Sequence, residues 1–244
     1  MLTSEQKERY QRQILALDEQ AQEKLVQKRV LIVGAGGLGS PLELYLTAAG
    51  IGEIVLFESD IVSLSNLGRQ VLYRTGDVGK SKAQLAKQRL ENLNPDVKIT
   101  IEEEWLTKQN AAKYLKNIDY LIDASDNFET KLLINDLGIE YNIPFTIAGI
   151  EGFDGQLISV DPHKTACYRC VFSSAPKTDK SRPIPVVAAT CGVVGSLQAM
   201  EVIKGLLNIG NRVTNALLMI NLRDNDFTKI QIRQNPKCQC AKKG

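Results

Sequence analysis

Three features of the sequence predict an α/β fold built on a mostly parallel sheet. Short apolar runs alternate with helical segments through residues 28–150, which is typical of βαβ units with right-handed crossovers. A glycine cluster separates the first apolar run from the first helix of this series. After Gly149 the alternation breaks, because the next strand-like run has no crossover helix before it. We therefore expect a Rossmann-like, mostly parallel sheet with helices on both faces, extended by antiparallel strands in the C-terminal half.

The domain organisation follows from length and from the absence of any linker-like stretch. The 244 residues suffice for one large α/β domain with its own core. No internal repeat or low-complexity segment divides them. We expect a single domain, 1–244, made of an N-terminal helical arm (1–27), a first half of the sheet (28–150) and a C-terminal half (151–244).

Composition limits the classes of function. Hydrophobic residues make up 43% and charged residues 24% of the chain, which is ordinary for a globular protein. A net charge of +2 gives no support for a nucleic-acid partner. The N-terminus lacks the apolar stretch of a signal peptide, and no apolar run approaches the roughly 20 residues that span a bilayer. We therefore expect a cytoplasmic enzyme without a membrane partner.

The first elements follow from the pattern of apolar residues. Residues 4–25 are polar, with apolar points such as Ile14 and Leu25, and are expected to be helical. The first βαβ unit covers about 29–58. In it an apolar run, the glycine turn and a helix lead to a second apolar run that ends at Glu58.

The remaining elements are predicted in the same way. Residues 80–94 should form a helix that ends at Asn94, because a residue that precedes a proline disfavours helical backbone. Residues 173–185 contain three prolines and mixed charges, which indicates an exposed loop. The other expected strands are 97–101, 120–122, 145–150, 155–160, 216–221 and 229–233, and the other expected helices are 108–116, 129–141 and 192–207.

The glycine cluster, Gly34, Gly36, Gly37 and Gly39, indicates a nucleotide site. A turn of this kind between a strand and a helix brings backbone N–H groups and a helix N-terminus to phosphate. Glu58 ends the second strand about 20 residues further on, where an acid can hold ribose hydroxyls. The alternative is a turn needed only for helix–strand packing, and the correct order of strand, turn, helix and acid favours nucleotide binding.

Charged residues further along the chain distinguish two kinds of nucleotide chemistry. Hydride transfer needs few fixed cations, whereas adenylyl transfer needs cations on a triphosphate and a carboxylate for a metal ion. The candidates are Arg12, Arg69, Lys82, Asp123 and Asp126. The two aspartates follow a predicted strand, at the carboxyl edge of the sheet, where a carboxylate suits Mg²⁺. Each residue alone could be a solvated surface charge, but beside a glycine turn the set favours phosphate chemistry.

Four of the five cysteines form two close pairs, Cys167 with Cys170 and Cys238 with Cys240. In a reducing compartment such pairs indicate a metal site rather than disulfides, although ordinary reduced thiols are the alternative. Cys191 stands directly before the predicted helix 192–207. A helix N-terminus can lower the pKa of a thiol, but we expect Cys191 to be a small buried packing residue.

Several motifs together carry a family resemblance. They are, in chain order, RYQRQ at 9–13, GAGGLGS at 34–40, SNLGRQ at 65–70, VGKSKA at 78–83, DASDN at 123–127, CYRC at 167–170 and GVVGSLQAMEVIK at 192–204. With these motifs the chain resembles the bacterial ubiquitin-activating-enzyme-like adenylyltransferases of the ThiF, MoeB and HesA type. The resemblance covers nearly the whole chain and is far more specific than a glycine fingerprint alone.

This resemblance implies an activity. Such enzymes use ATP and Mg²⁺ to adenylate the C-terminal glycine carboxylate of a ubiquitin-like sulfur carrier, ThiS- or MoaD-like, and release pyrophosphate. The products serve sulfur-containing cofactors such as thiamine and molybdopterin. On the same fold, adenylation of a tRNA base, a peptide or a small-molecule carboxylate remains an alternative. An NAD-dependent oxidoreductase and a binding module with a degenerate site are further alternatives, and both leave the cations unexplained.

The resemblance also assigns roles by position. Glu58 would hold the ribose, and Asn66, Arg69 and Lys82 would bind the triphosphate. Asp126 would bind Mg²⁺. Glutamate at position 58 departs from the more usual aspartate of the family, but the longer carboxylate can still reach a ribose.

Three further residues complete the implied site. Gln70 and Asn127 belong to the same motifs as Arg69 and Asp126 and are counted with the nucleotide-binding residues. Arg12 would reach the ATP of a partner subunit, which implies a homodimer with composite sites. The residues expected to act in catalysis are Arg12, Arg69, Lys82 and Asp126.

The paired cysteines fall where the family has a structural zinc site, so the half 151–244 would bind both the carrier and zinc. A closed site of four thiolates, Cys167, Cys170, Cys238 and Cys240, would be structural rather than catalytic. The second pair departs from the family's Cys-x-x-Cys spacing by one residue. That shorter spacing reduces the reach of the tail around a metal ion.

Overall fold

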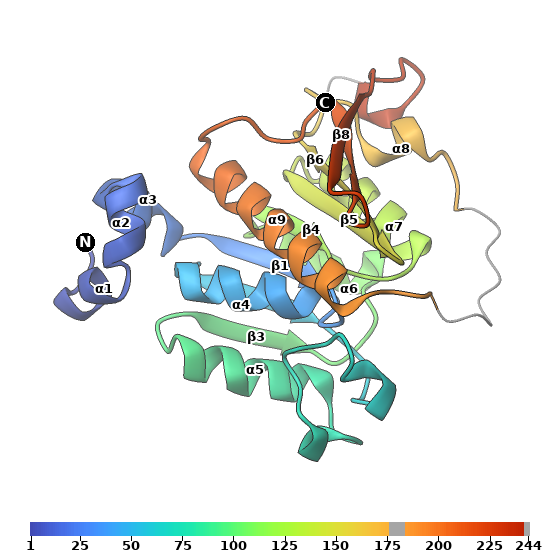
Figure 1. The fold of residues 1–244 in the computed structure, drawn as a ribbon. Coiled ribbons are helices and arrows are strands. Elements are labelled where there is room, and N and C mark those ends of the chain that lie inside the picture. The colour runs from blue at the N-terminus through green and yellow to red at the C-terminus, as the bar shows by residue number, and fades with distance from the viewer. Residues whose placement is uncertain (176–183, 242–244) are drawn as a thin grey trace.

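The structure, a computed structural model, describes residues 1–175 and 184–241. It contains an eight-stranded sheet in the order β3-β2-β1-β4-β5-β6-β7-β8 (Figure 1). Neighbours among β1 to β5 are parallel, whereas β6, β7 and β8 continue the same sheet in antiparallel fashion. The strands are β1 (Arg29–Val33), β2 (Glu53–Phe57), β3 (Lys98–Glu102), β4 (Tyr120–Asp123), β5 (Phe145–Glu151), β6 (Asp154–Val160), β7 (Ala216–Asn221) and β8 (Asp226–Gln231). The expected fold class is confirmed.

Helices cover both faces of the sheet. One face is packed by α4 (Gly39–Ala49), α5 (Lys82–Leu93) and α9 (Ala188–Leu207), and the other by α6 (Lys108–Leu115) and α7 (Phe128–Glu140). The central strand β1 serves both layers, because Ile32 belongs to the first apolar cluster and its neighbour Leu31 to the second. Because β1 is buried on both faces, its sequence is a continuous apolar run, and this run made its position predictable.

The N-terminal arm is helical, as expected, but consists of α1 (Ser4–Arg9), α2 (Gln11–Leu17) and α3 (Glu19–Leu25). It docks on the C-terminal end of α4. Tyr10 is buried there against Gly50, where an added Cβ would lie 2.5 Å from the Tyr10 ring. The side chains of Gln13 and Gln22 both donate to the carbonyl of Ala49.

The structure corrects several boundaries. The last helix, α9, begins at Ala188 rather than at residue 192, and the last strand covers Asp226–Gln231 rather than 229–233. A short helix, α8 (Tyr168–Val171), was not expected. Most of the predicted loop 173–185 lies outside the described residues. Among the helices of the described ranges, none is both long and apolar enough to cross a membrane.

The site location follows from the strand order. The chain leaves β1 toward β2 and β3, but leaves β4 in the opposite direction toward β5. The reversal between β1 and β4 makes a topological switch point, and in open α/β sheets ligands bind outside the carboxyl ends of the strands at such a point. A ligand is therefore expected at the loops that follow Val33 and Asp123.

Candidate nucleotide-binding site

Two glycines of the turn after β1 are required by close contacts with backbone atoms. Gly34 has a φ of +98°, and an added Cβ would lie 3.0 Å from the carbonyl oxygen of Ala124 in the loop after β4. At Gly39 an added Cβ would lie 2.1 Å from the carbonyl oxygen of Gly34. The two loops of the switch point therefore touch directly. Gly36 and Gly37 remain half-buried at the surface of the turn, where backbone can approach phosphate.

Glu58 lies at the end of β2, as predicted, and its side chain holds the start of the turn. One carboxylate oxygen, Oε2, accepts from the N–H of Ala35 at 2.9 Å, and Oε1 accepts from the N–H of Asp60 at 2.8 Å. Each oxygen retains a second lone pair, so ribose hydroxyls could still be bound.

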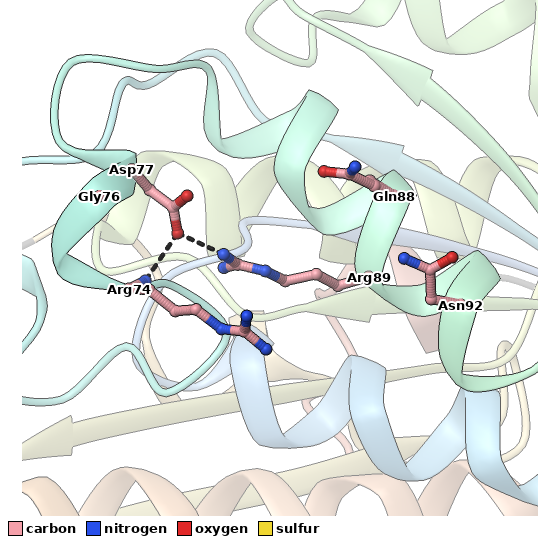
Figure 2. A pocket seen from close by; sticks show the side chains of 6 residues that line it. All are labelled: Arg74, Gly76, Asp77, Gln88, Arg89 and Asn92. Carbon is pink, nitrogen blue, oxygen red and sulfur yellow. Dashed lines mark hydrogen bonds and ion pairs between the residues drawn. The ribbon is translucent and has the colours of Figure 1, made fainter.

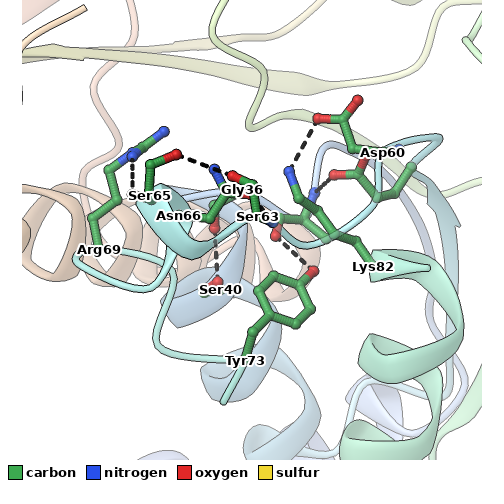
Figure 3. A network of polar contacts seen from close by, with 11 residues as sticks. Gly36, Ser40, Asp60, Ser63, Ser65, Asn66, Arg69, Tyr73 and Lys82 are labelled. Carbon is green, nitrogen blue, oxygen red and sulfur yellow. Dashed lines mark hydrogen bonds and ion pairs between the residues drawn. The ribbon is translucent and has the colours of Figure 1, made fainter. Parts of the chain in front are cut away.

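The segment after β2 brings two predicted phosphate ligands to the same edge. A 3-10 turn, Leu64–Asn66, is closed by Asn66, whose Oδ1 accepts from the N–H of Ser63 at 3.1 Å. Arg69 donates from Nη1 to the carbonyl of Ser65 at 3.2 Å (Figure 3). The local turn therefore fixes the direction of both side chains.

The predicted residue Gln70 and the unpredicted Tyr73 support the glycine turn. Gln70 is buried, and its Nε2 lies 3.6 Å from where a Cβ on Gly36 would be. The hydroxyl of Tyr73 donates to the carbonyl of Ala35 at 2.8 Å (Figure 3). Only its place just after the SNLGRQ motif could have indicated Tyr73, because the contact joins positions 38 residues apart.

Lys82 starts α5 and is nearly buried, with 4% of its surface exposed. Its ammonium group donates to Oδ2 of Asp60 at 3.0 Å (Figure 3). Asp60 was not among the predicted site residues, although its position two residues after Glu58 offered a signal. Asp60 therefore holds the Lys82 ammonium group close to Glu58, the residue that follows β2.

The two candidate aspartates, Asp123 and Asp126, lie in different environments at the end of β4 and in the loop that follows it. Asp126 is exposed, and Asn127 caps α7 by accepting from the N–H of Thr130 at 2.9 Å. Asp123 is fully buried and pairs with Lys131 at 2.7 Å. Burial raises the pKa of Asp123, and Lys131 opposes that shift. Asp126 is therefore the carboxylate that can meet a metal ion, whereas Asp123 is a structural group.

A buried glutamate that sequence reasoning missed lies behind the turn. Glu43 is fully buried on α4, and neither of its carboxylate oxygens has a hydrogen-bond partner within residues 1–175 and 184–241. Its Oε1 lies 2.9 Å from where a Cβ on Gly39 would be. Burial, with a further contribution from Glu58, raises the pKa of Glu43 well above its usual value. The sequence signal that could have indicated Glu43 was a single acidic residue in an apolar helix next to a glycine motif.

Cys191 lies in the first turn of α9 rather than directly before the helix, and is buried. Its Sγ occupies the space behind Gly37, 2.8 Å from where a Cβ on that glycine would be. Burial raises the pKa of the Cys191 thiol, and nearby Arg69 opposes the shift. These observations favour the packing interpretation over a reactive thiol.

Arg12 does not join the other predicted residues. It is exposed on α2, in the arm that docks on the C-terminal end of α4. The glycine turn lies at the N-terminal end of the same helix, and 11 residues of helix span about 16 Å. Within one chain α2, the helix that carries Arg12, therefore lies toward the opposite ends of the strands (Figure 1).

The four paired cysteines converge on one point despite the short spacing of the second pair. Their sulfur atoms all lie within 4.8 Å of one another. Cys167 is 3.6 Å from Cys238, and Cys170 is 3.4 Å from Cys240. Zinc–sulfur bonds of about 2.3 Å in a tetrahedron place sulfurs about 3.8 Å apart, which these distances approach. The cluster could hold a metal ion, and the 3-10 turn Gln239–Ala241 is what brings Cys240 inward.

A separate hollow of about 380 Å³ lies beside α5 (Figure 2). Its wall contains an ion pair of Arg89 with Asp77, and the same carboxylate accepts from the N–H of Arg74 at 2.7 Å. None of the predicted site residues lines it; the lining residues are Arg74, Gly76, Asp77, Gln88, Arg89 and Asn92. Arg89 is thus already paired with Asp77, and Asp77 also accepts from the backbone of Arg74.

A glycine turn, two basic side chains and an exposed carboxylate at the switch point of a doubly wound sheet define a nucleotide-binding protein of the Rossmann class. Residues 10–241 match the model of the ThiF family, and the chain belongs to this family.

Individual relatives align with this chain over nearly its full length. The chain is 41% identical to the sulfur carrier protein adenylyltransferase of Thermus thermophilus, covering 97% of this chain and 91% of that one. It is 38% identical to the sulfur carrier protein ThiS adenylyltransferase of Escherichia coli, covering 94% and 93%. A crystal structure of Escherichia coli MccB with MccA-N7isoASN has the same fold, with a TM-score of 0.87 at 24% identity over 99% of this chain and 76% of that one.

Proposed function

We propose that this protein uses ATP and Mg²⁺ to adenylate the C-terminal glycine carboxylate of a ubiquitin-like sulfur carrier, with release of pyrophosphate. The observation that carries the proposal is that Arg69 and Lys82 lie beside the glycine turn (Figure 3). The loop that carries the exposed Asp126 contacts the same turn at Gly34. The two relatives described above, which align with 97% and 94% of the chain, bear the name of this activity.

The arrangement suits attack by a carboxylate on an α-phosphate. Both groups are negative, so cations such as Arg69 and Lys82 lower their repulsion and stabilise the charge that develops on the phosphates. A bound Mg²⁺ would supply further charge neutralisation, and the exposed Asp126 is a suitable oxygen ligand for it. The attacking carboxylate is already ionised at neutral pH, so no general base is required.

The roles of the remaining residues follow from this chemistry. Backbone N–H groups of the turn 34–39 would receive the phosphates, with Asn66 as a further donor and Gln70 beneath the turn. Glu58 would bind the ribose through its remaining lone pairs, and Asn127 would fix the loop that carries Asp126. An oxidoreductase would leave Arg69 and Lys82 without a function.

A homodimer would complete the site with Arg12 from the partner subunit. Two observations support this. The helix that carries Arg12, α2, lies toward the opposite ends of the strands from the glycine turn. The outward faces of α4 and α9 are apolar, with Tyr45 57% and Met200 54% exposed. Two such helices side by side offer the kind of surface that a second copy covers. An arginine from outside the site is a known way to stabilise charge in phosphate chemistry.

The carrier's C-terminal tail would approach along the same edge of the sheet. A hollow of about 380 Å³ lies between the β5–β6 turn and the β7–β8 turn. Because β5 is parallel to β4, the end of β5 at Glu151 lies at the edge that carries Asp126. The aromatic ring of Phe153 and the guanidinium of Arg223, 4.9 Å from the ring centroid, form one wall.

We further propose that the cysteine cluster binds a structural Zn²⁺. Four thiolates would close the coordination sphere, and the cluster ties α8 to the C-terminal segment rather than to the nucleotide edge. Free thiols at this density fit a reducing compartment such as the cytoplasm.

ATP–pyrophosphate exchange against a panel of purified sulfur carriers ending in Gly-Gly tests the proposal. Exchange is expected only in the presence of ATP, Mg²⁺ and a cognate carrier, and it should be lost when the terminal glycine of that carrier is removed. Exchange that instead depends on a tRNA, a peptide or a small carboxylate would replace the carrier in the proposal. Hydride transfer to NAD without any exchange would overturn it.

A further inference from the structure

Two opposite charges are buried together at the end of β4. Lys131 and Asp123 have only 5% and 0% of their side-chain surface exposed. Each of the other ion pairs found within residues 1–175 and 184–241 has at least one partner whose side chain is 10% exposed or more. Burial of an ammonium group requires that its three N–H bonds find acceptors.

The ammonium group of Lys131 finds three acceptors on three different segments. It donates to Oδ2 of Asp123 in β4 at 2.7 Å and to the carbonyl of Ser125 in the following loop at 2.7 Å. The third bond, at 2.6 Å, goes to the carbonyl of Ala148 in β5. All three N–H groups are used, so Lys131 joins two strands and a loop with no donor left over.

The loop held in this way carries Asp126. On one side, Ser125 is fixed by Lys131 through its carbonyl and by Asp123 through its hydroxyl, which donates at 2.5 Å. On the other side, Asn127 is fixed as the N-cap of α7. Asp126, which carries the exposed carboxylate, therefore lies between two residues, Ser125 and Asn127, that are both held by hydrogen bonds.

We propose that Lys131 is a positioning residue, which holds the Asp126 carboxylate in the place where it meets Mg²⁺ bound to the nucleotide. The inference rests on the proposed function only for the identity of the nucleotide and the metal ion. Lys131 itself touches neither, because it is buried beneath the loop. Partners that orient a metal ligand in this way typically change metal affinity by about 10- to 100-fold when they are removed.

The test compares nucleotide binding at graded Mg²⁺ concentrations, measured with a fluorescent, non-hydrolysable ATP analogue. The main variant combines Lys131→Met with Asp123→Asn, so that no unpaired charge is left in the core. Its half-saturating Mg²⁺ concentration should rise about 10-fold or more. Affinity for the analogue without Mg²⁺ should stay unchanged. The single variant Asp123→Asn keeps the ammonium and two of its acceptors and should show a smaller rise in the same direction.

A matched control is Leu137→Ala, which weakens α7 from its buried side without touching the loop. A merely structural role for Lys131 predicts that the control and the double variant behave alike. An unchanged Mg²⁺ midpoint in the double variant, or in Asp123→Asn if the double variant does not fold, would overturn the inference. Because binding needs no carrier, a failure of the carrier assay would leave this result interpretable.

Discussion

The ammonium group of Lys82 lies 3.0 Å from Oδ2 of Asp60, at the first residue of α5 and beside the end of β2. The lysine is nearly buried, whereas the side chain of Asp60 is half exposed. The acid therefore holds the ammonium group in place, and in the proposed site a triphosphate would compete with Asp60 for it.

The first prediction concerns this lysine. Lys82→Ala should lower ATP–pyrophosphate exchange by about 100- to 1,000-fold, because one charge-stabilising donor is removed from the reacting phosphates. Circular dichroism should show an intact fold. Lys80→Ala, an exposed neighbour, is the control and should retain full exchange. An active Lys82→Ala enzyme would remove Lys82 from the proposed site.

The second prediction concerns the composite site. Arg12→Ala and Asp126→Ala should each abolish exchange in their own homodimers. Mixed dimers should recover about a quarter of wild-type activity, since random exchange makes half of the dimers mixed and each holds one complete site. Recovery is measured after mixing under conditions that exchange subunits, with the mixed species confirmed by mass. No recovery in confirmed mixed dimers would argue against an arginine acting from the partner subunit.

The third prediction concerns Glu43. Its folded-state pKa is raised well above that of the unfolded chain, so above about pH 4.5 the native state keeps a proton that the unfolded state releases. The contribution of Glu43 to stability therefore falls as pH rises from the unfolded-state pKa toward the folded-state pKa. Glu43→Leu should raise the free energy of unfolding at pH 7 by about 1–3 kcal/mol.

The pH dependence separates this effect from simple packing. The gain from Glu43→Leu should grow between pH 4 and pH 7, as followed by thermal unfolding at several pH values. Glu104→Leu, at an exposed position, serves as the control and should show no such trend. A gain of constant size at all pH values would mean that the Glu43 carboxyl is not held protonated.

The fourth prediction concerns the cysteine cluster. Elemental analysis of the wild-type protein should find about one zinc ion per chain. Cys238→Ser should lose most of that zinc and unfold at a lower temperature, because the metal couples the tail to the fold. Cys191→Ala is the matched control and should keep both zinc and adenylation. Zinc that survives in Cys238→Ser would place the metal elsewhere.

The parts of the fold that could be predicted are those with a strong local signal. The buried strand β1 is a continuous apolar run, and the glycine turn follows it at once. The start of α9 was wrong by four residues, because its N-cap position is Val187, which makes no side-chain capping bond. The strand β8 is exposed along its whole length, so its residues show no clear alternation of apolar and polar side chains.

The parts of the site that were missed depend on contacts between distant positions. Tyr73 supports the carbonyl of Ala35, and Lys131 reaches the carbonyl of Ala148 in the next strand. Neither residue type indicates such a role by itself, because a buried tyrosine or a helical lysine is common. The break between α2 and α3 was missed for another reason: Asp18 adopts a φ of 90° that is more often a glycine conformation.

The contact of Cys191 with the glycine turn has an evolutionary consequence. A methyl group at position 37 would enter the space that the Cys191 sulfur fills, whereas at position 36 only a flexible glutamine side chain lies nearby. Substitutions at positions 37 and 191 are therefore expected to affect each other. Alanine at position 37 would require the Cys191 sulfur to move or a smaller residue to stand at position 191, so a substitution at one position changes which residues are tolerated at the other.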